Sequence, residues 1–257
     1  MVLWLALVWQ IPNQQVNRPA SVMGRVVWQG DKPQVPWFRA PASPGVNQGD
    51  PGLKSWQNPF APTILSDGSM ANVLIWVEEG QAEPRPKLKV EVQDNQIRLE
   101  QGGRTVPVGL LGLGDSITVE SRQDTLFTLK ARGASSFALP LIEKAKNVTR
   151  KLEKPGWVEL SSGSGQYWAR AWLWVGAPQK ALFTDKNGSF EINGLKPGKV
   201  KIFARLPDWQ LSKFERDQET GEILMAQYQK PRIQVVETDL EPGGRAKVDI
   251  SFGAGQP

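Results

Sequence analysis

Residues 157–175 constrain the fold of this chain more than any other stretch, because two segments of alternating polarity flank a turn. Val158 and Leu160 alternate with polar neighbours in the first segment, and residues 171–175 repeat the pattern in the second. A period of two is typical of strands with one buried face. Residues 161–166 between them are rich in serine and glycine and carry no ionised group. The stretch therefore predicts a β-hairpin.

Short apolar segments of this kind recur along the chain, separated by turns that draw on 25 glycines and 20 prolines. Strands are expected at 20–30, 71–77, 88–92, 96–99, 105–108, 116–120, 126–130, 189–192, 199–204, 232–237 and 245–252. One interpretation of the ambiguous segment 133–154 is a short helix near 141–146, and 207–229 is expected to be a loop or an extended hairpin. About a dozen short strands with little helix predict an all-β protein built from two β-sandwich modules.

Residues 32–67 are rich in proline, glycine, glutamine and asparagine. We expect a long irregular arm that wraps the sandwich, with Trp37, Phe38, Trp56 and Phe60 pinning it to apolar surface. The alternative is a ligand-binding loop with exposed tryptophans.

Residues 1–19 begin with an apolar run, VLWLALVW at 2–9, which is too short to span a bilayer. It is interpreted as an export signal, although no basic segment precedes it, or as an N-terminal arm or strand. No other segment approaches membrane-spanning length, so we expect no membrane-spanning segment.

The sequence contains no cysteine and no histidine. It therefore lacks thiolates and imidazoles, which are the usual nucleophiles, general bases and soft metal ligands. Ser161, Ser162 and Ser164 lie in a glycine-rich turn without the strand–elbow–helix context of a serine nucleophile. We expect no enzymatic activity and no cofactor.

The net charge is +5, and one basic concentration stands out. It consists of Lys144, Lys146, Arg150, Lys151 and Lys154, diluted by nearby glutamates. It is interpreted as a solvated face or as an anion-binding patch. No aromatic residue interleaves with these cations, so nucleic acid is not an expected partner.

Four large side chains mark the second strand of the predicted hairpin as a candidate binding surface: Trp168, Arg170, Trp172 and Trp174. Arg170, Trp172 and Trp174 share one face by period two. Such a face binds sugars by stacking, docks a partner, or is the covered side of a two-layer sandwich. The sequence leaves binding and packing both open.

Residues 184–204, TDKNGSFEINGLKPGKVKIFA, follow the pattern T-D-x-x-G-x-F-x-I-x-G-L-x-P-G-x-Y, with valine in place of the tyrosine. The matching residues are Thr184, Asp185, Gly188, Phe190, Ile192, Gly194, Leu195, Pro197 and Gly198. The segment resembles the carboxypeptidase-regulatory-like module, a transthyretin-type β-sandwich. The resemblance implies a stability or interaction unit, usually extracellular, formed by 20–80 with 179–253. Asn187-Gly188 also predicts a tight turn on its own chemistry.

Residues 88–175 resemble a cupredoxin-like domain of bacterial exported proteins, a Greek-key sandwich. The similarity runs through Ala71-Asn72-Val73, Val106-Pro107-Val108-Gly109, residues 114–120, Pro155-Gly156 and Arg170-Ala171-Trp172. In that family the corresponding hairpin carries a cysteine, a histidine and a methionine that hold copper with a second histidine. The resemblance implies a cupredoxin-like domain over 88–178.

Carried over position by position, the copper ligands of that family fall on Phe127, Gly163, Gln166 and Ala169. None of the four supplies a thiolate, imidazole or thioether. We therefore expect a degenerate metal site, with Phe127 filling the vacated space as part of the core.

These observations predict a non-catalytic, secreted or periplasmic β-sandwich protein that acts as a structural or protein-interaction module at the cell envelope. The alternative is a carbohydrate- or anionic-polymer-binding module that uses surface tryptophans or the basic segment. The expected partner is an envelope protein or a polysaccharide whose identity the sequence leaves open.

Overall fold

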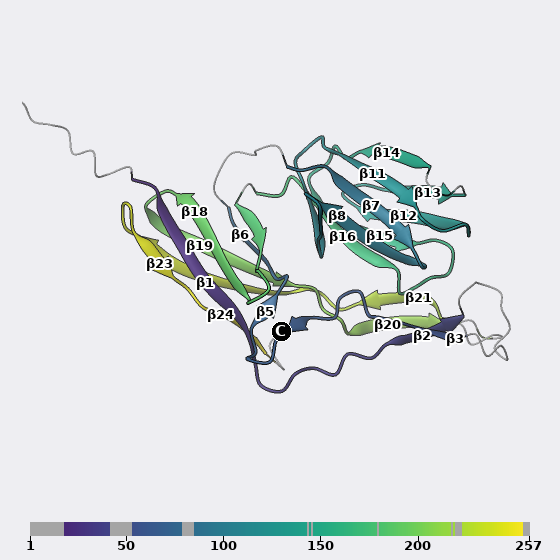
Figure 1. Cartoon of the computed structure of the whole chain (residues 1–257), viewed down its shortest axis with the longest axis horizontal. Coiled ribbons are helices and arrows are strands. Elements are labelled where there is room, and N and C mark those ends of the chain that lie inside the picture. The colour runs from purple at the N-terminus through teal and green to yellow at the C-terminus, as the bar shows by residue number, and fades with distance from the viewer. Residues whose placement is uncertain are drawn as a thin grey trace, which may run out of the picture.

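The computed structural model describes residues 18–41, 53–78, 85–142, 144, 146–178, 180–216, 218 and 223–253. Every regular element within these ranges is a β-strand. The strands form two sandwiches, one at each side of the molecule (Figure 1). We call the described residues up to 78 and from 180 onward the first module, and those from 85 to 178 the second module.

The first module packs two sheets of four strands against each other. One sheet is centred on β1 (Ala20–Gln29), which pairs with β18 (Ser189–Leu195), β23 (Arg245–Lys247) and β24 (Ile250–Gly253). The other has the order β17 (Ala181–Phe183), β6 (Leu74–Val77), β19 (Gly198–Leu206) and β22 (Arg232–Leu240). Alternate residues of β1, among them Val22, Val26 and Trp28, enter the shared core.

Two local features explain how the first module closes. Gly24 in β1 allows the backbone at Val248, just before β24, to pack closely against β1. A Cβ at position 24 would lie 1.7 Å from the carbonyl oxygen of Val248. In the turn before β18, Asp185 Oδ1 accepts hydrogen bonds from the backbone N–H groups of Asn187 and Ser189 at 2.8 and 2.9 Å. Gly188 takes a φ of 74°, which favours glycine. The tight turn predicted at this point is present.

The second module packs two sheets of five strands. The first has the order β10 (Val108–Leu111), β16 (Arg170–Val175), β15 (Gly156–Ser162), β12 (Phe127–Gly133) and β13 (Phe137–Leu141). The second has the order β14 (Asn147–Lys151), β11 (Ser116–Ser121), β7 (Leu88–Gln93), β8 (Gln96–Gln101) and β9 (Arg104–Thr105). The pairs β10–β16 and β7–β11 are parallel, and the others are antiparallel.

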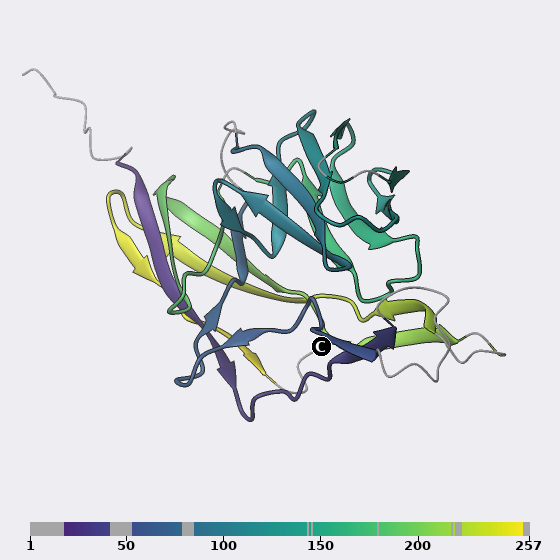
Figure 2. The same cartoon turned by 45° about the vertical axis from the view of Figure 1, so that its right-hand side comes forward.

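Three short hairpins complete the fold. They are β2 (Phe38–Pro41) with β3 (Leu53–Trp56), β4 (Thr63–Ile64) with β5 (Met70–Ala71), and β20 (Leu211–Arg216) with β21 (Ile223–Tyr228). In both cartoon views β2–β3 lies beside β20–β21, and the two hairpins reach from the first module beneath the second (Figures 1 and 2).

The all-β sandwich fold predicted from the sequence is confirmed, and so is the hairpin at 157–175. Its strands β15 and β16 pair in antiparallel register, and Val158, Leu160 and Leu173 are completely buried. Residues 207–229 do contain an extended hairpin, β20–β21. Across the described ranges the chain forms no helix with the length and apolarity that a membrane crossing needs.

The short helix near 141–146 was a wrong prediction. Leu141 is the last residue of β13, where it pairs with Phe127, and Lys144 lies in a turn before β14. Pairing with β12 and burial of Leu141 decide the conformation here, since tertiary contacts override a weak local preference for helix.

Candidate functional site

The loop between β15 and β16 is tied to the start of β12 by its backbone and serines. The Gly163 N–H donates to the carbonyl oxygen of Thr128 at 2.7 Å, and the Thr128 N–H donates to Ser164 Oγ at 2.7 Å. Within the loop, Ser162 Oγ donates to Gln166 Oε1. These bonds fix the loop that carries three of the four positions aligned with copper ligands.

Those positions do not form a metal site. Phe127, Gln166 and Ala169 are buried, and the Gln166 amide oxygen is already bonded to Ser162. Gly163 has no side chain, and a Cβ there would meet the Lys130 side chain. No group of three or more carboxylate, thiol or imidazole side chains comes together anywhere in the described residues. A copper ion prefers thiolate, imidazole and thioether donors, so the residues present do not fit it.

The same loop is covered by the first module. Trp56 of β3 stacks on Trp168 with ring centroids 4.9 Å apart and planes at 15°. Phe38 of β2 meets Tyr167 edge-on at 5.4 Å. Arg170 Nη2 donates to the carbonyl oxygen of Ala226 in β21 at 3.0 Å. The β2–β3 and β20–β21 hairpins together cap this end of the second module.

Most aromatic residues expected to pin the arm at 32–67 are buried in this cap or beside it. Phe38, Trp56 and Phe60 are buried, and Phe60 contacts the ring of Tyr228 at 4.6 Å. Trp37 is the exception, with 57% of its surface exposed. The described part of the arm therefore serves mainly to join the two modules.

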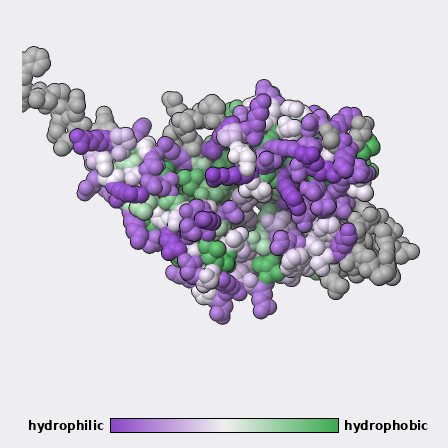
Figure 3. Space-filling model, in the orientation of Figure 1, coloured by the Kyte–Doolittle hydropathy of each residue, from purple (hydrophilic) through white to green (hydrophobic). Residues whose placement is uncertain are grey.

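The tryptophan face of β16 is partly buried in the contact between the modules. Trp174 stacks on Trp157 at 4.9 Å and meets Trp76 of β6 edge-on at 5.1 Å. Trp76 in turn stacks on Phe203 of β19 at 5.0 Å. The space-filling view shows hydrophobic atoms in the middle of the molecule, where the modules meet, amid a mostly hydrophilic surface (Figure 3).

The four residues proposed as a binding surface on this hairpin are thus separated. Trp172 and Trp174 lie in the module contact, whereas Trp168 is buried in the core of the second module. Arg170 is held by Glu159 Oε1 at 3.3 Å, by the Tyr167 carbonyl and by the Ala226 carbonyl. They do not form an open platform for a sugar ring or a partner.

The basic segment lies apart from this contact, on β14 and the turn before it. Lys151 Nζ lies 3.3 Å from Glu153 Oε1, and Lys144 Nζ lies 3.6 Å from Asp124 Oδ2. Lys146, Arg150 and Lys151 are exposed. Ion pairs of this exposed kind contribute little, so the segment has the character of a solvated edge strand.

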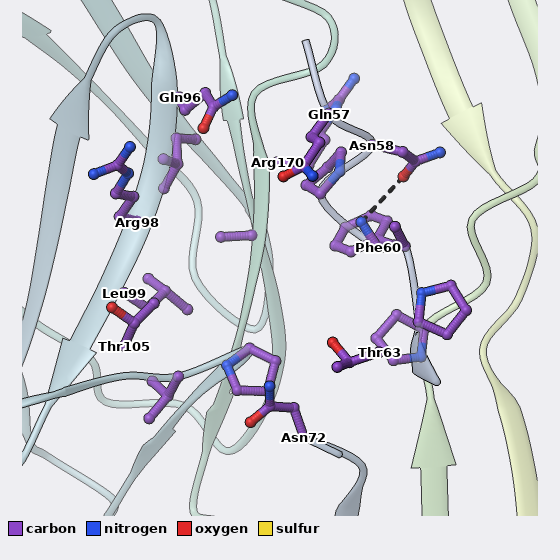
Figure 4. A pocket seen from close by; sticks show the side chains of 18 of the residues that line it. Gln57, Asn58, Phe60, Thr63, Asn72, Gln96, Arg98, Leu99, Thr105 and Arg170 are labelled. Carbon is purple, nitrogen blue, oxygen red and sulfur yellow. Dashed lines mark hydrogen bonds between the residues drawn. The ribbon is translucent and has the colours of Figure 1, made fainter. Parts of the chain in front are cut away.

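A cleft of about 710 Å³ opens between the modules (Figure 4). Residues 57–64 of the arm form one wall, and residues 96–99 of β8 with 105–107 form the other. Asn58 fixes the arm, since its Nδ2 donates to the Trp209 carbonyl at 2.8 Å and its Oδ1 accepts from the Phe60 N–H at 3.0 Å. No pattern in the sequence predicted this cleft, because its walls lie far apart along the chain.

The cleft is lined by amides, hydroxyls and guanidinium groups. The polar side chains on its walls that make no hydrogen bond within the described part of the protein are Gln57, Thr63, Asn72, Gln96 and Thr105. Arg98 and Arg170 also line it, and the described lining residues include no aspartate, glutamate or lysine. Prolines and Phe60 supply apolar surface between the polar groups. The cleft suits a polar ligand that is neutral or negatively charged.

No family model matches this chain, and no curated protein matches it. Among solved structures it is similar to a copper-containing nitrite reductase from Thermus scotoductus SA-01, at 14% identity over 39% of this chain, with a TM-score of 0.30. The match spans about a quarter of that reductase, 24% of its chain.

Two smaller proteins are similar over nearly their whole length. A purple cupredoxin from Nitrosopumilus maritimus is 11% identical over 34% of this chain and 97% of its own, with a TM-score of 0.27. An oxidised amicyanin variant is 13% identical over 44% of this chain and 97% of its own, with a TM-score of 0.29. The likeness concerns the fold alone.

Proposed function

We propose that this protein is a non-catalytic β-sandwich protein of the cell envelope that acts as a structural or protein-interaction module. The observation that carries the proposal is the cap over the β15–β16 loop. A loop that exchanges a metal ion or electrons with a partner must be reachable, whereas Trp168 lies under Trp56 and Tyr167 lies against Phe38. The aligned positions also lack copper donors, which supports a scaffold role.

The same proposal includes the first module, which we interpret as a carboxypeptidase-regulatory-like sandwich. Its support is the signature at 184–204 and the role of Thr184 in the fold. Thr184 Oγ1 donates to the Met70 carbonyl at 2.7 Å and accepts from the Val73 N–H at 3.0 Å, and so joins the turn before β18 to the start of β6. The proposal that the protein is exported is supported by the apolar run at 2–9.

An exposed apolar pair supports docking of a protein partner at the edge of the second module. Leu126 and Ile142 flank the Phe127–Leu141 pair of β12 and β13, and each is more than half exposed. β13 is the last strand of its sheet in the described structure, and an uncovered sheet edge with apolar neighbours is suited to association.

Photo-crosslinking in intact cells tests this proposal. A photoreactive residue at position 142 is expected to give a discrete adduct with an envelope protein, and one at position 149 on β14 of the other sheet is not. Purified protein is expected to show no intense visible absorption band when one equivalent of cupric ion is added. Absence of any adduct at 142, or tight stoichiometric copper binding, contradicts the proposal.

A second candidate function is binding of a polysaccharide segment in the cleft. It is favoured by the amides and hydroxyls on both walls that have no hydrogen-bond partner among the described residues. We expect Gln57→Ala and Thr105→Ala each to weaken glycan binding by about threefold to tenfold, the effect of losing one hydrogen bond. Gln229→Ala, outside the cleft, is the control. Glycan-array binding followed by titration measures the effect, and equal affinity of all variants contradicts this function.

A further inference from the structure

Two arginines of the first module are buried against tryptophan rings, and they differ in one respect. Arg232 lies over Trp209 at 4.8 Å, its Nε pairs with Asp208 Oδ2 at 3.0 Å, and its Nη1 donates to the Gly253 carbonyl at 2.9 Å. Arg205 lies over Trp157 at 3.8 Å and beside Trp172 at 5.6 Å. Arg232 therefore has both ring contacts and hydrogen-bond acceptors.

The Arg205 guanidinium contacts aromatic rings but has no hydrogen-bond acceptor among the described residues. Only 4% of its surface is exposed, and its Nη1 is enclosed with no hydrogen-bond partner. Within the described residues no ion pair or hydrogen bond joins its guanidinium to any carboxylate or carbonyl. Burial lowers the pKa of Arg205 to about 10, so the group stays charged at neutral pH.

A buried charge without a counter-charge is unfavourable, and buried polar groups are nearly always hydrogen-bonded. Contact with two indole rings offsets part of this cost, but the rings supply no hydrogen-bond acceptor for the N–H groups of the guanidinium. The planar guanidinium fork matches the oxygens of a carboxylate or phosphate group in geometry and charge. An oxyanion would supply both the acceptor and the counter-charge that Arg205 lacks within the described residues.

We propose that Arg205 anchors an oxyanion-binding site between the two modules, which takes a carboxylate or phosphate group. Arg205 belongs to β19 of the first module, whereas Trp157 and Trp172 belong to β15 and β16 of the second. The bound oxyanion completes the contact between the modules and so strengthens their association. This site is separate from the proposed docking edge at β13.

Unfolding of the full chain in different anions tests the site. Inorganic phosphate and acetate are compared with chloride at equal ionic strength and pH 7. The unfolding equilibrium of the wild type is expected to shift toward the folded state by about tenfold when the free concentration of the anion that binds is ten times its dissociation constant. The shift is expected to disappear in Arg205→Met and to persist in Arg132→Gln, which removes an exposed arginine outside the cleft.

Each outcome decides the proposal. A shift with phosphate alone assigns a phosphate group, a shift with acetate alone assigns a carboxylate, and a shift with both assigns their shared chemistry. Equal shifts in wild type and Arg205→Met place the effect on the surface and overturn the site. Titration calorimetry of phosphate and acetate into the wild type needs no variant, and absence of one-site binding heat for both also overturns it.

Discussion

Replacing Arg232 with methionine is expected to lower the free energy of unfolding by about 3–5 kcal/mol, because it leaves a buried carboxylate without its cation. Asp208 is 4% exposed, and Arg232 is its only ion-pair partner in the described structure. The substitution also removes the hydrogen bond to Gly253 at the end of β24 and the cation over Trp209. Denaturation by urea at pH 7 measures the loss.

The double variant Asp208→Asn with Arg232→Met separates the orphaned charge from the lost packing. Since asparagine carries no charge, the double variant is expected to recover a large part of the stability that the single variant loses. Equal losses in the single and double variants would show that the carboxylate is not what makes the substitution costly. Arg205→Met is the matched comparison, because it removes a stacked arginine without orphaning an acid.

The second large effect is expected at Phe127, the position aligned with the first copper-binding histidine. Phe127 is completely buried in the core of the second module, beside Leu129 and Leu141. Phe127→Ala is expected to cost about 3–5 kcal/mol, through lost burial and the cavity that remains. The measurement is again urea denaturation of the full chain.

Phe214→Ala is the matched control, because Phe214 of β20 is 50% exposed. Its substitution is expected to change the free energy of unfolding by about 0.5 kcal/mol or less. If Phe127→Ala is tolerated as well as the control, the Phe127 side chain is not needed to fill the core, and the interpretation of this residue as core packing is wrong.

Alternation in the sequence predicted the strands but not which faces are covered. In β19, Lys199, Lys201, Phe203 and Arg205 share one face by period two. The two lysines are exposed and Arg205 is buried, because the second module covers only one end of that face. Phe203 marks the change from the exposed to the covered end, but an arginine beside it is equally compatible with exposure, so the burial of the Arg205 guanidinium could not be predicted.

The same limit applies to the candidate site. Trp172 and Trp174 have the same spacing in an open platform and in a buried contact, and the sequence left both interpretations standing. The cleft lies beyond any local pattern, since its walls come from the arm, β8 and the end of β19. The turn at 185–188 was predictable because its hydrogen bonds are complete within five consecutive residues, 185–189.

The partners of β1 decide the order in which this chain is able to assemble. β1 is the first described strand, yet the strands of its own sheet, β18, β23 and β24, lie more than 150 residues later, and its one nearer pairing in the described residues is an isolated bridge of Val27 with Ser69. During synthesis it has no strand of its sheet to pair with until β18 at 189–195 has emerged, whereas every described strand of the second module finds its neighbours within that module. The inserted module is therefore able to fold first, and the strands that flank it remain open to aggregation or to chaperones until the end.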